Sequence, residues 1–152
     1  MNVLLDTNII IYLIRAKEGL KLNHYLNPID NDIHISYVSV AEVESFALQN
    51  NWGRIKMQRL EFLMDEMQII QVDDVLLKSF IDIDSYSQRN HPDFKSYPFE
   101  TPRNMGKHDL WIAATASLLD LQLVTTDSDF NHLEKEFLHL RYIKQAEIRK
   151  YL

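Results

Sequence analysis

The sequence has no cysteine, which excludes disulfide bonds and metal sites built from thiolate ligands. No apolar run approaches the roughly 20 residues of a membrane-spanning helix. No basic region precedes the first apolar run, so the N-terminus does not resemble a signal peptide. Internal repeats and low-complexity segments are missing as well. These absences predict a cytoplasmic protein with no membrane segment.

The composition is that of a globular protein, with 46% hydrophobic and 25% charged residues. A length of 152 residues predicts one domain, residues 1–152, large enough to bury a core. The net charge of −6 argues against a protein that binds nucleic acid through a uniformly basic surface. It is compatible with an enzyme whose acidic centre is neutralised by metal ions.

Strand-like and helix-like segments alternate along the chain. The first strand lies in the apolar run of residues 3–11, which Asp6 interrupts, and further strands are predicted at 33–37, 67–72, 121–126 and 138–143. Helices are predicted at 8–17, 20–26, 40–49, 54–66, after Asp73 or Asp74, at 107–120, and after Asp127. This alternation predicts an α/β fold of three layers, α/β/α, with a central, mostly parallel sheet of four to five strands.

Three segments depart from this regular pattern. Gly19 is expected to end the first helix, as a glycine just past a helix commonly does. Residues 147–152 are expected to form a frayed tail. Residues 87–106 form a long loop that contains three of the four prolines, Pro92, Pro98 and Pro102. A loop of this length in a compact domain is either functional or a mobile insertion, and both interpretations stay open.

Four acidic residues are predicted to share one edge of the sheet. Asp6 and Asp127 each follow a predicted strand, while Glu42 and Asp109 lie near the start of predicted helices. In a parallel sheet the connecting helices run against the strands, so helix N-termini lie beside the carboxyl ends of strands. We therefore expect all four carboxylates at the same edge.

Each acid also has a simpler explanation. Asp6 and Asp127 are possible helix N-caps, and Asp109 complements a helix dipole. Glu42 is a possible capping-box partner of Ser39, taken as the cap of the helix at 40–49. Taken together, however, four carboxylates repel one another unless a cation lies among them. Oxygen ligands without His or Cys favour Mg²⁺ or Mn²⁺, a pair of which supports attack of water on a phosphodiester.

Four segments carry a resemblance to a known family: LDTN at 5–8, AE at 41–42, DLWIAA at 109–114 and TTDSDF at 125–130. In this order they resemble the signatures of PIN-domain ribonucleases, and within these the VapC toxins of bacterial toxin–antitoxin pairs. The resemblance covers nearly the whole chain. It implies a PIN-like fold and Mg²⁺- or Mn²⁺-dependent endonucleolytic cleavage of RNA.

The resemblance also implies roles for particular residues. The positions matching the family's catalytic, metal-binding acids are Asp6, Glu42, Asp109 and Asp127. Asp129 matches a further acid at the metal. Asn8 and Thr126 match polar residues that orient the carboxylates, although both are equally explained as ordinary turn and cap residues. Toxins of this kind commonly form homodimers and are silenced by a cognate antitoxin whose tail covers the acidic site.

Several alternatives remain at this point. Glu44 competes with Glu42, but it is expected on another side of the helix. Two basic and aromatic groups either contact RNA or are solvated helix faces: Trp52 with Arg54, Lys56 and Arg59, and Arg103 with Lys107 and His108. The whole chain is alternatively a non-catalytic PIN-like binding module or scaffold, or a PIN nuclease of RNA processing rather than a toxin.

Overall fold

A five-stranded, entirely parallel sheet forms the centre of the computed structural model, which describes residues 1–152. Its strands are β1 (Val3–Leu5), β2 (Ile33–Ser36), β3 (Gln68–Ile70), β4 (Gln122–Thr125) and β5 (His139–Tyr142). They are arranged in the order β3-β2-β1-β4-β5, and each neighbouring pair is parallel. The prediction of a parallel sheet of four to five strands is confirmed.

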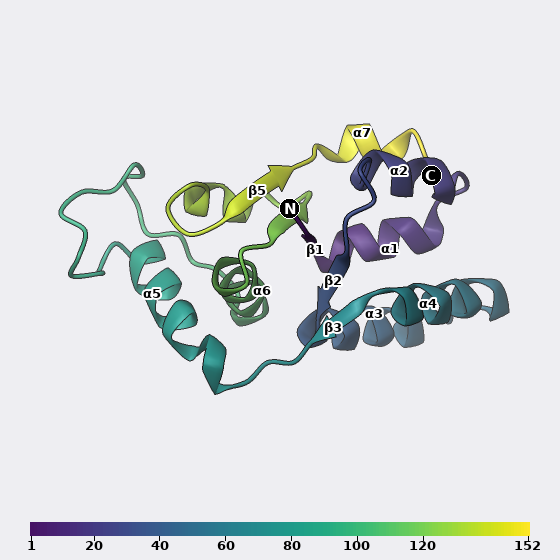
Figure 1. The fold of residues 1–152 in the computed structure, drawn as a ribbon, viewed down its shortest axis with the longest axis horizontal. Helices are drawn as coiled ribbons and strands as arrows, with labels where there is room; N and C mark the ends of the chain where they lie inside the picture. The colour runs from purple at the N-terminus through teal and green to yellow at the C-terminus, as the bar shows by residue number, and fades with distance from the viewer.

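Helices cover both faces of this sheet (Figure 1). One face carries α1 (Thr7–Arg15), α2 (Gly19–Leu26), α3 (Tyr37–Gln49), α4 (Arg54–Glu66) and α7 (Gln145–Arg149). The other face carries α5 (Leu77–Ser87) and α6 (Lys107–Leu118). Two short 3₁₀ turns complete the chain, η1 (Asp74–Leu76) and η2 (Ser128–Leu133). This arrangement confirms the three-layer α/β/α class.

The central strand β1 is buried because it is apolar on both faces. Side chains alternate across a strand, so Val3 and Leu5 pack into the core beneath α1 to α4, while Leu4 packs into the core beneath α5 and α6. All three are at most 2% exposed. A strand buried on both sides is typical of a parallel sheet, and it holds the end of β1 in a fixed position.

The start of α3 differs from the prediction that Ser39 caps a helix beginning at residue 40. The helix begins at Tyr37, and Ser36 is its N-cap, with Oγ accepting a hydrogen bond from the Val38 amide at 3.2 Å. Ser36 is the last residue of β2 and directly precedes the helix, so its side chain lies beside the free amides of the first helical turn. The capping box of Ser39 and Glu42 is therefore wrong.

The prediction that Gly19 ends the first helix is also wrong. Helix α1 ends at Arg15, the next residue, Ala16, is already extended, and Gly19 is the first residue of α2. No glycine in the chain has a positive φ, so no helix here ends through a left-handed glycine. The chain leaves α1 through an extended residue instead.

The C-terminal segment is ordered by packing rather than frayed. Ile148, on α7, is fully buried, and the rings of Tyr151 and Tyr25 stack with their centroids 5.7 Å apart. The Tyr151 carbonyl accepts hydrogen bonds from the amides of Lys17 and Glu18, between α1 and α2. The expectation of a frayed tail is wrong because this segment covers the ends of those helices.

The long α5–α6 loop has no regular secondary structure, yet it has a core of its own. Tyr86, at the end of α5, is 1% exposed, and its ring contacts four Phe and Tyr rings. Centroid distances are 4.8 Å to Phe94, 5.3 Å to Tyr97, 5.5 Å to Phe99 and 5.0 Å to Phe137. We call these five residues the aromatic cluster. It fixes the loop at one end of the molecule (Figure 1).

None of the helices is both long enough and apolar enough to cross a membrane.

Candidate active site

The chain changes direction across the sheet between β1 and β4. From β1 it proceeds outward to β2 and β3, and it then returns to β4 on the other side of β1. Ligands of open α/β proteins commonly bind at such a switch point, beside the carboxyl ends of the strands. Asp6 directly follows β1, and Asp127 lies two residues past the end of β4. The sheet therefore delivers two acids to this edge.

Asp6 is almost completely buried, with 5% of its surface exposed. Its Oδ1 accepts a hydrogen bond from the Thr7 amide at 2.7 Å, and its Oδ2 accepts one from Thr125 Oγ1 at 2.6 Å. Burial raises the pKa of Asp6, the two hydrogen bonds oppose that shift, and the charges of Asp127 and Glu42 add to it. Asp6 is thus an N-cap of α1 and also part of a group of acids.

Glu42 lies in the second turn of α3 and points toward α1. Thr7 Oγ1 is 2.9 Å from both Glu42 Oε1 and Ser39 Oγ. A carboxylate only accepts, so Thr7 donates to Glu42 and accepts from Ser39. On its other side, Glu42 Oε2 lies 3.5 Å from His108 Nδ1. Glu44 is exposed and is not among the charges that act on Asp6 or Asp109.

Asp109 is the acid whose ionisation is most disturbed. It lies in the first turn of α6, and its pKa is raised from 3.8 to about 7. Burial is the largest cause, followed by the negative charges of four other acids, which are Asp6, Asp127, Glu42 and Asp129. A single position thus experiences every other acid that the sequence placed at this edge. We call the five residues the acidic cluster.

Asp127 and Asp129 belong to the same turn. Asp127 Oδ1 accepts a hydrogen bond from the Asp129 amide at 2.8 Å, which makes Asp127 the N-cap of η2. Its own amide donates to Thr125 Oγ1 at 2.9 Å, and that hydroxyl in turn donates to Asp6. The simpler capping explanation is therefore correct for Asp127 as well. Capping fixes where this carboxylate lies within the cluster.

The chemistry of the acidic cluster fits a hard divalent cation. Its donors are all carboxylate oxygens, the type that Mg²⁺ and Mn²⁺ prefer, and the negative charges of the neighbouring acids add to the effect of burial in raising the pKa values of Asp6 and Asp109. No three His, Asp or Glu side chains are arranged to hold one ion as they stand. The oxygens of Asp6 and Asp127 face amides and hydroxyls instead. Metal binding therefore requires side chains to rotate within a backbone frame that is already in place.

Hydroxyl groups that the sequence did not single out contact the acids. Thr7 and Thr125 donate to Glu42 and Asp6, while the side chains of Asn8 and Thr126 make no hydrogen bond to any acid of the cluster. Thr7 directly follows Asp6 in the sequence, and Thr125 lies two residues before Asp127. Their position, a hydroxyl residue at a strand end close to an acid, was the sequence signal that could have identified them.

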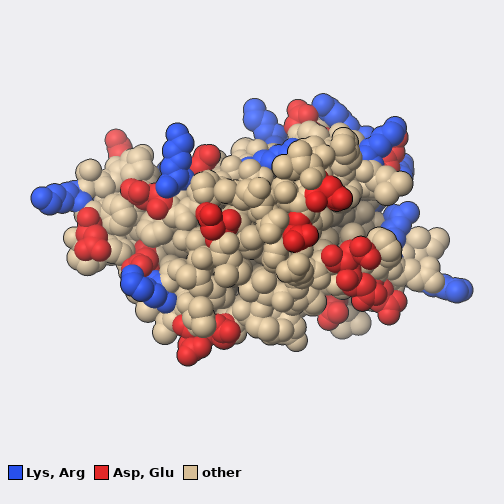
Figure 2. Space-filling model, viewed as in Figure 1, with Lys and Arg blue, Asp and Glu red and all other residues tan.

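Of the two basic and aromatic groups, the first is largely structural. Arg59 Nη1 donates to the carbonyls of Ile14 at 2.9 Å and Ala16 at 3.3 Å, and it thereby caps α1. Lys56 lies over the Trp52 ring, beyond the opposite end of α3 from its N-cap. On the face shown in Figure 2, most Lys and Arg side chains lie near the outline and form no continuous basic surface.

Comparison with known proteins places this geometry in a family context. The family model of the PIN domain matches residues 3–136. A search of curated protein sequences finds no match. Among solved structures, VapBC2 from Rickettsia felis, bound to a promoter DNA fragment, is similar with a TM-score of 0.72 and 21% identity, covering 93% of this chain and 98% of that one.

Two further structures are similar over the same extent. FitAcB from Neisseria gonorrhoeae has a TM-score of 0.70 and 23% identity, covering 92% of this chain and 96% of that one. VapBC-5 from Mycobacterium tuberculosis, a member of the VapBC family of toxin–antitoxin systems, has a TM-score of 0.62 and 24% identity, covering 94% and 98%. At these identities the likeness concerns the fold.

Proposed function

The chain belongs to the PIN domain family, and we propose that it is a metal-dependent endoribonuclease that acts as the toxin of a toxin–antitoxin pair. The observation that carries the proposal is the convergence of four negative charges on Asp109, the third residue of α6. Such a concentration of carboxylates destabilises the protein unless a cation relieves it. The concentration of carboxylates at this edge is explained if the site serves to bind cations.

The proposed roles follow from the contacts of each side chain. Asp6, Glu42, Asp109 and Asp127 would hold the metal, with Asp129 beside them. A bound Mg²⁺ or Mn²⁺ ion supplies a water of lowered pKa and charge stabilisation at the phosphodiester. Thr125 orients the carboxylate of Asp6, and Thr7 orients that of Glu42. The chain itself need not provide a covalent nucleophile.

The proposed partner is an antitoxin protein. VapBC-5, which has the same fold, is described as a member of a family of toxin–antitoxin systems. We extend that assembly to this chain, together with a homodimer and a cytoplasmic location, as the family resemblance implies. A small neighbouring reading frame for a DNA-binding protein would support the antitoxin, and sedimentation of the purified chain would test the homodimer.

The decisive experiment is cleavage of RNA by the purified protein. We expect internal cuts in the presence of Mg²⁺ or Mn²⁺, none with EDTA, and recovery when excess Mg²⁺ is returned. Calorimetry should show divalent binding that Asp109→Asn weakens. Absence of both cleavage and divalent binding would favour a non-catalytic binding module.

A second measurement separates a toxin from an RNA-processing nuclease. Controlled expression of the chain in bacteria should arrest growth, and expression of the Asp109→Asn variant should not. RNA cleavage in vitro without growth arrest would retain the nuclease and reject the toxin. Rescue of growth by the neighbouring gene would identify the antitoxin.

A further inference from the structure

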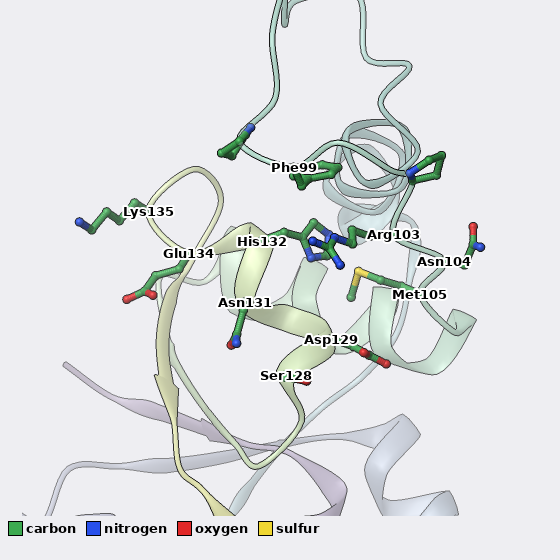
Figure 3. Close-up of a pocket in the computed structure, with 12 residues that line it drawn as sticks. Phe99, Arg103, Asn104, Met105, Ser128, Asp129, Asn131, His132, Glu134 and Lys135 are labelled. Carbon is green, nitrogen blue, oxygen red and sulfur yellow. The ribbon is translucent and has the colours of Figure 1, made fainter.

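A cavity of about 800 Å³ opens between the end of the α5–α6 loop and η2 (Figure 3). The loop contributes Phe99, Arg103 and Asn104 to its lining, and η2 contributes Asn131 and His132. Most of the lining is polar. Apart from Asp129, its lining residues have no part in the roles proposed above, and its volume is typical of a site for a small ligand.

The cavity adjoins the acidic cluster. Asp129 lines it, and the charge of the same residue acts on Asp109. In the close-up, Ser128 and Asp129 lie at one end of the cavity, while Glu134 and Lys135 lie at the other (Figure 3). The cavity and the acidic cluster thus share Asp129, and a chain bound at the acidic cluster has the cavity directly beside it.

Arg103 provides a cation that no carboxylate in the protein neutralises. Its guanidinium lies over the Phe99 ring, 5.6 Å from the centroid, and takes part in none of the ion pairs of the structure. Its backbone amide donates to the Ser87 carbonyl at 2.7 Å, which fixes the base of the side chain. The five N–H donors of the guanidinium are therefore available to a ligand at a defined place.

The rest of the wall offers both hydrogen-bond donors and acceptors. His132 Nε2 is 2.7 Å from Ser87 Oγ, and its ring lies nearly parallel to Tyr86 at 6.4 Å. Asn104 Oδ1 accepts from Gln88 Nε2 at 2.9 Å, which leaves the Asn104 amide hydrogens free. The Asn131 side chain has no hydrogen-bond partner within the protein. The Arg103 charge and these two amides match the groups of a nucleotide, since phosphates take cations and base edges pair with amides.

We propose that this cavity binds a nucleotide of the RNA chain adjacent to the phosphodiester cut at the acidic cluster, with Arg103 on the phosphate and Asn104 and Asn131 on the base. The inference rests on the proposed ribonuclease function and adds a determinant of which sequence is cut. The formal charge of the lining is balanced, because it contains two cations, Arg103 and Lys135, and two carboxylates, Asp129 and Glu134. Attraction to RNA thus depends on the position of Arg103 rather than on a basic surface.

The test compares two variants that remove one positive charge from the same loop. Arg103→Gln alters the cavity, whereas Lys95→Gln removes an exposed lysine of the loop that does not line it. Affinity is measured by fluorescence anisotropy with a labelled random-sequence RNA pool, in EDTA, so that no cleavage occurs. We expect about 10- to 100-fold weaker binding for Arg103→Gln, as for loss of a contact to a charged group, and less than about twofold for Lys95→Gln.

Two additional readouts separate a specific contact from a change in folding. Loss of one phosphate contact should reduce the slope of log affinity against log salt by about 0.7 for Arg103→Gln alone. Arg103→Lys, which keeps the charge, should recover most of the affinity, and the thermal midpoints of all three variants should match that of the parent protein.

Sequencing of cleavage products addresses the base. Asn131→Ala should flatten the nucleotide preference at one position beside the cut while leaving the cutting rate on the best substrate within a few-fold. Equal affinity losses in Arg103→Gln and Lys95→Gln, or no loss in either, would overturn the inference even if RNA is cut normally. The same result is expected if a protein segment, rather than RNA, occupies the cavity. Arg103-dependent binding without cleavage under any metal would instead reject the nuclease and retain the RNA site.

Discussion

The acidic cluster and the aromatic cluster are built by the same fold in opposite ways. In the acidic cluster, carboxylates are buried beside like charges, and both the burial, which is the larger cause, and the neighbouring charges raise the pKa values of Asp6 and Asp109. In the aromatic cluster, the ring of Tyr86 is surrounded by four others and is 1% exposed. One region disfavours the folded state without a ligand, and the other stabilises it.

This difference distinguishes residues kept for chemistry from residues kept for packing. Aromatic burial of the kind seen at Tyr86 contributes several kcal/mol to the folded state, whereas concentrated carboxylates reduce that stability. Strain of this kind persists where the surrounding structure holds it in place. The two clusters meet at the cavity, because Phe99 and Asp129 both line it. The packed loop thus supports a wall beside the unfavourable site.

The largest effect expected is on catalysis at the acidic cluster. Asp6→Asn or Asp109→Asn should reduce RNA cleavage by about 10³-fold, the upper range for loss of one group that stabilises a transition state electrostatically. Glu44→Gln is the matched control for Glu42→Gln, because Glu44 lies on the same helix and is exposed. Cleavage rates of the four variants in Mg²⁺ provide the measurement. If Glu44→Gln were as harmful as Glu42→Gln, the assignment of the cluster would fail.

The next effect is on stability at the aromatic cluster. Tyr86→Ala should lower the free energy of unfolding by about 3–5 kcal/mol, because it removes a buried ring and leaves a cavity among its neighbours. Tyr86→Phe keeps the ring and should cost less than about 1 kcal/mol. Urea titrations of the metal-free protein measure both. A small effect of Tyr86→Ala would show that the loop is not held by these rings.

The fold was predictable because it depends on patterns that local physics determines. Short apolar runs become buried strands, and helical periodicity between them places helices on both faces, so β1, β2, β4 and the bounds of α4 follow closely from the sequence. The errors lie where a tertiary contact decides. Ser36 rather than Ser39 caps α3, and the C-terminal helix is ordered by the packing of Ile148 and Tyr151 against the ends of other helices.

The candidate site was predictable only in part. Strand ends and helix starts meet at one edge of any parallel sheet, which places Asp6, Glu42, Asp109 and Asp127 without coordinates. The hydroxyls that orient them depend on side-chain direction across two strands, as in the hydrogen bond from Thr125 to Asp6. Likewise, sequence spacing does not reveal that the aromatic residues of the loop converge on Tyr86. Contacts between segments distant in sequence were the missing information.

A smaller effect is expected on the pH dependence of stability. The pKa of Asp109 is raised to about 7 in the folded protein, above its ordinary value of 3.8, so folding is favoured when Asp109 is protonated. Metal-free protein should therefore lose stability as the pH rises from about 3.8 to about 7, and little more above that. Because the carboxyl is partly exposed and solvent screens its neighbours, we expect only about 1–2 kcal/mol between the two forms.

Asp109→Asn tests the origin of that pH dependence. The amide does not ionise, so the variant should be more stable than the parent protein at pH 8 without metal and should show a flatter profile between pH 5 and 8. Thermal midpoints in EDTA measure both. Excess Mg²⁺ should raise the midpoint of the parent protein more than that of the variant. A variant that is less stable at every pH would indicate that Asp109 serves the helix rather than a metal.

The smallest effect concerns the contact that joins the loop to η2. Ser87 is fully buried, and its Oγ is hydrogen-bonded to His132 Nε2 at 2.7 Å, so Ser87→Ala leaves a partly buried ring nitrogen without a partner. We expect a loss of about 1 kcal/mol in the free energy of unfolding. Ser96→Ala, at an exposed position of the same loop, should change the free energy of unfolding by less than about 0.5 kcal/mol.

Because the hydrogen bond between Ser87 and His132 holds His132 at the cavity, Ser87→Ala should also weaken RNA binding slightly, while Ser96→Ala should not. Stability lost with unchanged RNA affinity would mean that the packed loop stabilises the fold independently of the cavity beside the acidic cluster.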